Sequence, residues 1–193
     1  MPKPSHRDKI LSEGLKVVHA RGYAGASVRD IVQAAGVPQG SFTNHFTSKE
    51  AFGLEVLNLY FGFTLEAVQA TLRNDYLPPL QRLRAYLNFV KSRLQGENLR
   101  NGCLMGNFSA EVVDQSETIR QRLIEIFAEL QRAHAHCLKA AVAAGEVPPA
   151  LDCEATAELI VSYLEGAFLM SKVQRSVAPI EHFEHMLFSV ILR

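Results

Sequence analysis

The sequence lacks several features that mark particular classes of protein. It has no tryptophan and only three cysteines in 193 residues. Cys103, Cys137 and Cys153 are odd in number, far apart and not arranged as a CxxC pair, which argues against a disulfide framework and a structural zinc site. No apolar run approaches the roughly eighteen residues of a membrane span, and residues 1–7 contain no apolar signal core. We therefore expect a cytoplasmic protein with no membrane span, no metal and no cofactor.

The sequence also lacks a net charge, but its charges are unevenly distributed. Residues 1–50 hold seven basic and four acidic side chains, and the remainder holds thirteen basic and sixteen acidic ones. Phosphate attraction requires positive charge only where a duplex lies, so a basic N-terminal segment on an acidic remainder fits a modular DNA-binding protein. The asymmetry is small, and on its own it is weak support for this interpretation.

Apolar side chains recur at helical spacing along almost the whole chain, and no strand-like alternation bounded by turn residues is present. The pattern predicts an all-α protein of about nine helices. Its expected domains are an N-terminal helix-turn-helix domain over residues 1–50 and a regulatory and dimerisation domain over 51–193. The expected helices cover 6–22, 27–36, a short segment opened by Pro38, 47–73, 79–96, 103–114, 116–145, a segment capped by Asp152, and a last one from Pro179.

The last two of these helices have almost no polar face. The segment from Ala157 to Met170 is nearly all apolar, and Ile180, Phe183, Leu187 and Phe188 follow in the last helix. A soluble helix of this kind must be covered on both sides. We therefore expect a second copy of the chain to cover them, which makes the protein a homodimer.

Residues 27–52 have the spacing of a helix-turn-helix. Ser27 and Asp30 form a predicted capping box, and Gly36 lies in a tight turn before a second short helix. The apolar positions of both helices pack together, which leaves a polar set expected to be exposed: Gln39, Gly40, Ser41, Thr43, Asn44 and His45. Neutral donors and acceptors of this kind suit base edges and phosphates.

This segment strongly resembles the TetR family of bacterial repressors. The likeness lies in a Ser opening the second helix, then Asp-Ile, Ala-Ala-Gly-Val, Gly-Ser-Phe, His-Phe and Ser-Lys-Glu-Ala-Phe. It implies a bacterial dimer that binds an inverted-repeat operator in double-stranded DNA. The DNA-binding residues implied are Ser27, Val28, Gln39, Gly40, Ser41, Thr43, Asn44, His45 and Lys49, with Ser27 and Lys49 on phosphates. Thr43 departs from the family pattern, in which a phosphate-binding tyrosine is usual, and its hydroxyl reaches less far.

Residues 102–123 and 163–180 resemble the branch of this family that contains an electrophile- and hypochlorite-responsive repressor and an acrylate-responsive repressor. That likeness implies that Cys103 is a redox-active thiol and that Lys172 is its partner. A helix N-terminus and a nearby lysine would favour the reactive thiolate. The alternative is that Cys103 is a small buried residue without reactivity, as we expect for Cys137 and Cys153.

Other features allow further interpretations. Eight aromatic side chains could line an apolar ligand cavity, although spacing alone makes them core residues: Tyr60, Phe63, Tyr86, Phe89, Phe108, Phe127, Tyr163 and Phe168. His134 with Cys137, and His182 with His185, each offer two metal ligands on one helix face, but no third ligand is evident. We therefore expect core or solvated histidines.

Three functions remain in competition at this stage. The first is a repressor released by an electrophile or oxidant at Cys103, and a variant of it is release by a non-covalent small organic ligand, such as a short unsaturated acid. The second is a helical thiol enzyme of the glutathione-transferase kind, which lacks the expected α/β pattern and a base for Cys103. The third is a plain helical interaction module, which would not require the polar set from Gln39 to His45.

Overall fold

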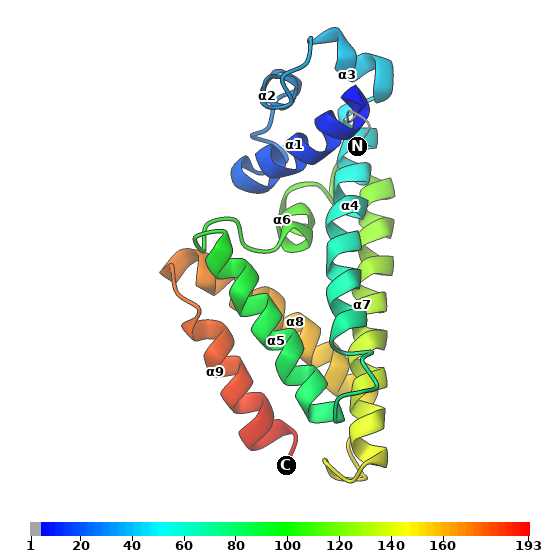
Figure 1. The fold of residues 1–193 in the computed structure, drawn as a ribbon, viewed down its shortest axis with the longest axis vertical. Coiled ribbons are helices and arrows are strands. Elements are labelled where there is room, and N and C mark those ends of the chain that lie inside the picture. Colours follow the sequence, from blue (N-terminus) through cyan, green and yellow to red (C-terminus); the bar gives the residue numbers. More distant parts are fainter. Residues whose placement is uncertain (1–4) are drawn as a thin grey trace. The chain divides into compact units, whose positions relative to one another are not determined.

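The computed structural model describes residues 5–193, and these residues form helices and no strand (Figure 1). The elements are α1 (His6–Arg21), α2 (Val28–Ala34), α3 (Gly40–His45), α4 (Lys49–Ala70), α5 (Pro79–Gly96), α6 (Leu104–Glu111), α7 (Glu117–Ala143), α8 (Cys153–Gln174), α9 (Ala178–Met186) and a π-helical turn, η1 (Leu187–Ile191). The predicted all-α fold is confirmed. Lys3, part of the basic N-terminal segment, lies outside the described residues.

The chain divides into two compact units. The head unit comprises the described residues up to Gly62 together with Leu104–Ile124, and the body unit comprises Phe63–Cys103 and Glu125–Arg193. The helices α4 and α7 each contribute residues to both units. The unit that contains the helix-turn-helix also includes the first part of α4, up to Gly62, and all of α6.

In the head unit, α1 packs against α2 and α3 around a small apolar core (Figure 1). Ile10, Val18 and Ile31 are completely buried. The rings of Phe42 and Phe46 lie 5.4 and 5.1 Å from that of Phe52 on α4, centroid to centroid. Full burial of a large apolar side chain stabilises a fold by about 1.5–3 kcal/mol, so this cluster fixes the short helices on α4.

In the body unit, α9 packs against α5 and α8. Leu83, Leu87, Ile180 and Phe183 have no exposed surface. Large apolar side chains of α8 nevertheless remain partly uncovered: Leu159 is 44%, Tyr163 43%, Leu169 62%, Met170 45% and Val173 69% exposed. The predicted shortage of polar groups on α8 thus leaves an apolar surface that this copy of the chain does not cover.

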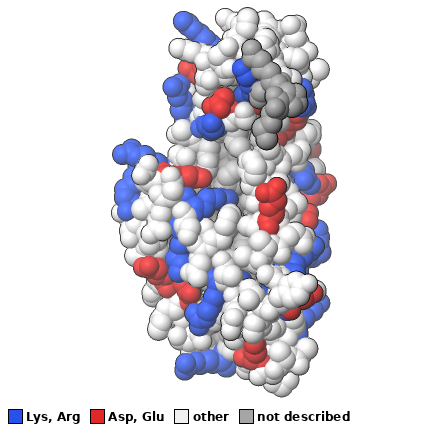
Figure 2. All heavy atoms as spheres, viewed as in Figure 1, with Lys and Arg blue, Asp and Glu red and all other residues white. Residues whose placement is uncertain are grey.

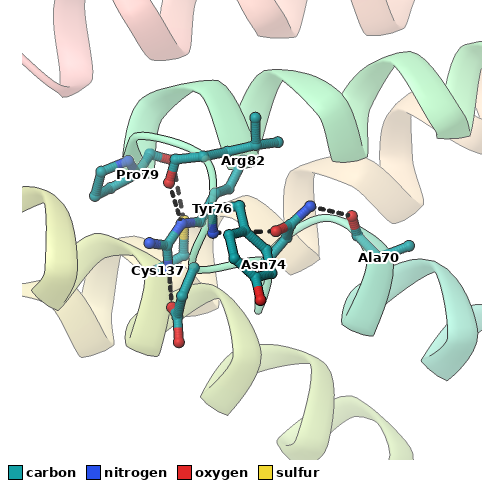
Figure 3. A network of polar contacts seen from close by, with 8 residues as sticks. Ala70, Asn74, Tyr76, Pro79, Arg82 and Cys137 are labelled. Atoms are coloured by element: carbon teal, nitrogen blue, oxygen red, sulfur yellow. Dashed lines mark hydrogen bonds and ion pairs between the residues drawn. The ribbon is translucent and has the colours of Figure 1, made fainter.

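Hydrogen bonds fix the turn between α4 and α5 (Figure 3). The Asn74 amide donates to the Ala70 carbonyl (3.3 Å), and Arg82 donates to the Leu77 carbonyl through Nε (2.7 Å). The Cys137 thiol of α7 donates to the Pro79 carbonyl (3.2 Å). Burial raises the pKa of this thiol to about 11, which disfavours the reactive thiolate at neutral pH.

The helix α4 passes a length and composition test for a membrane span. Its most apolar window has a mean hydropathy of 1.2, and half of that window is buried within the protein. Core helices of water-soluble proteins pass the same test, and α4 supplies Phe52, Val56, Leu57 and Phe61 to the head-unit core. We therefore interpret α4 as a core helix.

Two predicted helix starts differ in detail from the structure. Helix α3 begins at Gly40 and not at Pro38, because the Pro38 carbonyl accepts the first turn's hydrogen bond from the Ser41 N–H (2.9 Å) and so precedes the helix. The N-terminal cap of α4 is Ser48 and not Thr47, since the Ser48 hydroxyl accepts from the Ala51 N–H (3.0 Å).

Candidate functional site

Local sequence signals build the helix-turn-helix. The Ser27 hydroxyl accepts from the Asp30 N–H (3.1 Å) and the Asp30 carboxylate accepts from the Ser27 N–H (3.1 Å), so the predicted capping box begins α2. Gly36 follows α2 with φ of +63°, a conformation that residues with a Cβ rarely adopt. The Val37 N–H then reaches back to the Val32 carbonyl (3.1 Å), which closes the turn that leads to α3.

Helix α3 exposes most of the polar set expected to face DNA. Gln39, Gly40, Asn44 and His45 are exposed, as is Thr43. The expectation that Ser41 is exposed is wrong, because only 8% of its surface is accessible. Ser41 is buried together with its neighbour Phe42, on the side of this short helix that packs against α1 and α2.

The shorter side chain at position 43 is also turned toward its own helix. The Thr43 hydroxyl donates to the Gly40 carbonyl (3.1 Å). Such a bond to the preceding turn is common for threonine in a helix. It keeps the hydroxyl on α3, which agrees with the shorter reach expected from the sequence.

The two side chains expected on phosphates have partners inside the protein. The Ser27 hydroxyl is engaged in the capping box, and it remains on an exposed residue next to half-buried Val28. The ammonium of Lys49 donates to the Tyr23 carbonyl (2.7 Å) and lies 4.5 Å from the centroid of the Tyr23 ring. Burial lowers the pKa of Lys49, although the nearby Glu111 carboxylate acts in the opposite direction.

Surface charge supports DNA binding less than the uneven charge distribution along the sequence suggested. On the face drawn in Figure 2, basic and acidic side chains are interspersed, with no broad field of one sign. The arginine on α1 closest to α2, Arg21, is paired with Asp30 (2.8 Å). Polar groups on α3 therefore carry the case for DNA binding more than net charge does.

Cys103 lies in the body unit directly before α6, and its surroundings differ from those expected. The thiol is buried, with 3% of the residue exposed, and it donates a hydrogen bond to the carboxylate of Glu165 on α8. Burial raises the pKa of Glu165 to about 7, against the opposing effects of that bond and of Arg93 on α5. Burial also raises the pKa of Tyr86 above its ordinary value. The charge of Arg93 lowers this pKa, and Cys103 and Glu165 raise it.

The structure pairs Cys103 with a residue other than its expected partner. Among the contacts described for residues 5–193, Lys172 has no hydrogen bond or ion pair with Cys103, and Lys172 is half-buried at the C-terminal end of α8. Glu165 lies seven residues earlier on the same helix, two turns away, and takes the place beside the thiol. The sequence held one signal for Glu165, which is a carboxylate within an otherwise apolar stretch of α8.

His134 is a second buried titratable group of the body unit. Its Nδ1 is paired with the Leu130 carbonyl (2.8 Å), while Nε2 is buried without a hydrogen-bond partner among the described residues. Burial lowers the pKa of His134 to about 4. The ring meets that of Tyr86 edge-on at 5.0 Å, so histidine here is a neutral core residue, as expected.

The eight aromatic side chains do not form one buried set. Tyr60 and Phe108 belong to the head unit, where Tyr60 meets His19 and Phe108 meets Tyr23. Phe63 is 50% exposed, and Tyr163 stacks on Phe183 at the surface of α8 and α9. Tyr86 and Phe168 are buried, while Phe89 and Phe127 are half-buried. The expectation that all eight are core residues is therefore wrong for Phe63 and Tyr163.

No metal centre is formed within residues 5–193, where no three His, Cys, Asp or Glu side chains gather around one point. A surface groove of about 500 Å³ lies along α8 and α9, and Tyr163, Ala167, Met170 and His182 are among the residues that line it.

Comparisons with known proteins cover nearly the whole chain. A family model described as "Bacterial regulatory proteins, tetR family" matches residues 10–56, and one described as "Tetracyclin repressor-like, C-terminal domain" matches residues 79–187. The repressor DhaR of Mycobacterium sp. (strain GP1) is 34% identical over 192 residues, which cover 100% of this chain and 95% of DhaR.

Two further relatives are similar to this chain over most of its length. The transcriptional regulator AcuR of Cereibacter sphaeroides is 30% identical over 174 residues (90% of this chain, 80% of AcuR), and the repressor NemR of Escherichia coli K12 is 29% identical over 185 residues (91% and 88%). The crystal structure of regulatory protein TetR from Rhodobacter sphaeroides matches with a TM-score of 0.90 at 29% identity, covering 95% of this chain and 97% of that one. The reduced form of E. coli NemR matches with a TM-score of 0.80 at 25% identity, covering 94% and 96%.

Proposed function

Since the chain belongs to the TetR family of transcriptional regulators, we propose that it represses genes by binding an inverted-repeat operator as a dimer, and that a small chemical signal acting on the body unit releases it. Family membership also removes the thiol-enzyme alternative, because the relatives are regulators. The observation that carries the DNA-binding part is the exposed polar set of α3, presented by a capped and tightly turned helix pair.

In this proposal α3 enters the major groove. Gln39, Asn44 and His45 offer donors and acceptors to base edges, and Gly40 permits close approach of the backbone to DNA. Ser27 and Val28 at the start of α2 face the phosphate backbone, where helix N–H groups favour anions. Thr43, with its hydroxyl bound to its own helix, contributes less to phosphate binding.

The proposed dimer forms through α8 and α9. Leu159, Leu169, Met170 and Val173 place exposed apolar surface on one helix, and the groove lined by Tyr163 and His182 continues it. Large exposed apolar patches mark interaction sites, and a second copy of the same surface is the simplest two-fold partner. Two-fold symmetry would place two α3 helices about 34–36 Å apart, one turn of B-DNA.

For the signal, we propose an electrophile or oxidant that modifies Cys103. The resemblance to NemR, which has been described in a reduced form, supports a redox role. Burial of the thiol and its bond to Glu165 favour a second candidate, a non-covalent organic ligand, because a neighbouring carboxylate opposes thiolate formation. Either signal would act through a difference in operator affinity between two states of the protein.

One assay tests the repressor and both signals. An inverted-repeat duplex is first selected from a random pool with the wild-type protein, and its release is followed by fluorescence anisotropy. N-ethylmaleimide, hypochlorite and acrylate are applied to the wild type, to Cys103→Ser and to Cys137→Ser, which is a matched control with a buried thiol on α7. Covalent sensing requires that Cys103→Ser binds the duplex normally and resists the first two reagents, while Cys137→Ser is released.

The other outcomes are equally informative. Release of Cys103→Ser by acrylate would establish the non-covalent candidate, and release of it by both thiol reagents would exclude Cys103 as the sensor. A purified protein that is monomeric, or that selects no duplex at low ionic strength, would overturn the repressor proposal itself.

A further inference from the structure

The loop between α1 and α2 is held from two other helices of the head unit. It comprises Gly22, Tyr23, Ala24 and Gly25, and it sets the direction in which α2 leaves α1. Gly22 has φ of +81°, and its N–H donates to the Val18 carbonyl (2.9 Å), so the backbone turns sharply at this residue. A displacement of this loop therefore changes the position of the helix-turn-helix.

The first contact comes from α6. The Glu111 carboxylate accepts a hydrogen bond from the Ala24 N–H (3.0 Å). It also lies against the backbone of Gly22, where an added Cβ would come within 2.7 Å of Glu111 Oε1. One turn earlier on α6, the fully buried Phe108 meets the Tyr23 ring at 5.3 Å. Two residues of α6 thus hold three residues of the loop.

The second contact comes from the start of α4. The Lys49 ammonium donates to the Tyr23 carbonyl (2.7 Å), and the Tyr23 ring packs so tightly on α4 that a Cβ at Gly53 would lie 2.6 Å from it. The charge of Glu111 stabilises the charged form of Lys49 against the effect of burial. Lys49 and Glu111 therefore carry opposite charges and both bind the backbone of the same loop.

The chain also links this arrangement to the proposed sensor. Helix α6 runs for eight residues from Leu104 to Glu111, which is about 12 Å at 1.5 Å per residue. Its first residue follows Cys103 directly, and the Leu104 N–H donates to the Tyr60 hydroxyl (3.2 Å). Glu111 is its last residue. A short helix is stiff along its axis, so a displacement at the Cys103 end reaches the Glu111 end.

We propose that Glu111 is a positioning residue for DNA binding, which together with Lys49 holds the Gly22–Gly25 loop and makes the placement of the helix-turn-helix depend on α6. This rests on the proposed repressor function and deepens it. In the DNA-binding state, the bond from Ala24 to Glu111 keeps α2 and α3 in register with the groove. When α6 shifts, this bond is lost and operator affinity falls. Lys49 then acts on DNA binding from inside the head unit, and not through a phosphate.

Substitution of Glu111 tests this inference, because a positioning role and simple electrostatics predict opposite changes in operator affinity. Removing a negative charge from a DNA-binding unit should, through electrostatics alone, leave operator binding unchanged or strengthen it. Loss of a positioning hydrogen bond should weaken it instead. We expect Glu111→Ala to bind the selected operator about tenfold more weakly, the scale of one lost hydrogen bond to a charged group. Glu111→Gln, which keeps an acceptor for the Ala24 N–H, should restore most of the affinity.

Two controls complete the comparison. Glu117→Ala removes an exposed carboxylate from the same unit, one that pairs with Arg120 and does not touch the loop, and it should bind as the wild type does. N-ethylmaleimide, applied as in the release assay above, should weaken operator binding less in Glu111→Ala than in the wild type, so that the ratio of affinities with and without this reagent falls toward one. Glu111→Ala with wild-type or higher affinity overturns the inference.

Lys49→Met supplies the second variant, because it keeps an aliphatic chain on the Tyr23 ring and removes the ammonium. If Lys49 only supports the loop, affinity falls while the slope of log K against log salt stays at the wild-type value. A phosphate contact at each half-site would instead lower the slope by about 1.8, and this result overturns the role given to Lys49. Failure of the wild type to bind the duplex refutes the proposed function, whereas normal wild-type binding with unaffected variants refutes only this inference.

Discussion

Replacing Glu165 by glutamine tests the buried environment of Cys103. In the wild type, the Glu165 carboxylate faces the Cys103 thiol, with Arg93 and Tyr86 of α5 nearby, and burial raises its pKa from 4.5 to about 7. Glutamine has nearly the same shape but carries no charge at any pH. A difference between the two proteins that depends on pH therefore reports the charge of Glu165 alone.

The sign follows from proton linkage. Because the pKa of Glu165 is higher in the folded protein than in the unfolded chain, the folded state holds the proton more tightly. The free energy of unfolding then decreases as the pH rises from about 4.5 to about 7, and the loss is complete above that range. A shift from 4.5 to about 7 corresponds to about 3 kcal/mol. We expect the wild type to lose most of this amount relative to Glu165→Gln between pH 5 and pH 8.

Urea unfolding at pH 5 and pH 8, at one fixed protein concentration, measures the effect. Glu158→Gln is the matched control, because it removes an exposed carboxylate from the same helix. Contributions of other groups, such as His134, cancel when variants are compared at the same pH. Parallel pH dependence of the wild type and Glu165→Gln would refute the assigned surroundings of Glu165. Its charge also opposes formation of the Cys103 thiolate, so alkylation of Cys103 at pH 8 should be faster in Glu165→Gln.

Two further predictions concern other parts of the molecule. His134, whose folded pKa is lowered to about 4, binds a proton more readily when unfolded, so its contribution to stability is lost as the pH falls from about 6.5 toward 4. We expect His134→Phe to remove up to about 3 kcal/mol of acid sensitivity in urea unfolding at pH 7 and pH 4.5, and unchanged acid sensitivity would contradict the assigned burial. Thr43→Tyr should strengthen binding to operator and unrelated duplexes alike, by up to about tenfold per added hydrogen bond, and it should leave the salt slope unchanged because a phenol carries no charge. Titrations at several salt concentrations measure both quantities, and an unchanged affinity would mean that position 43 does not approach a phosphate.

The helix-turn-helix could be predicted because its signals are local. The capping box of Ser27 and Asp30 and the left-handed turn at Gly36 each depend on residues three or four apart, and the structure contains both. The burial of Ser41 could not be predicted in the same way. A helix of six residues makes fewer than two turns, so its apolar pattern does not define which side packs inward, and the packing of α3 against α1 and α2 buries Ser41 beside Phe42.

The surroundings of Cys103 and Lys49 depend on contacts between distant parts of the chain. Glu165 is about sixty residues from Cys103, and only the packing of α8 against its neighbours brings the two together. For Lys49, a flexible side chain at a helix start has two destinations, a phosphate outside or the Tyr23 carbonyl inside. No sequence pattern distinguishes them, because both accept a hydrogen bond from an ammonium group.

The burial of Cys103 determines how strongly an adduct on this thiol would displace α6. Protein cores are packed about as densely as organic crystals, so an adduct on a thiol that is 3% exposed has no free space to occupy. Overpacking of a core costs about 1–3 kcal/mol, and a shift of the segment that carries the adduct would reduce that cost. The segment that follows Cys103 is α6. Coupling free energies between sites are about 1–3 kcal/mol, or about 5–150-fold in affinity, so the cost of one adduct is of the size that the proposed release of the operator requires. A non-covalent ligand must supply the same free-energy difference by binding one state of the body unit more tightly than the other. A small acid can bind in a buried site only if a cation of the protein pairs with its carboxylate. Arg93 is the cation already beside Glu165, so protonation or displacement of that carboxylate is the step through which such a ligand would act.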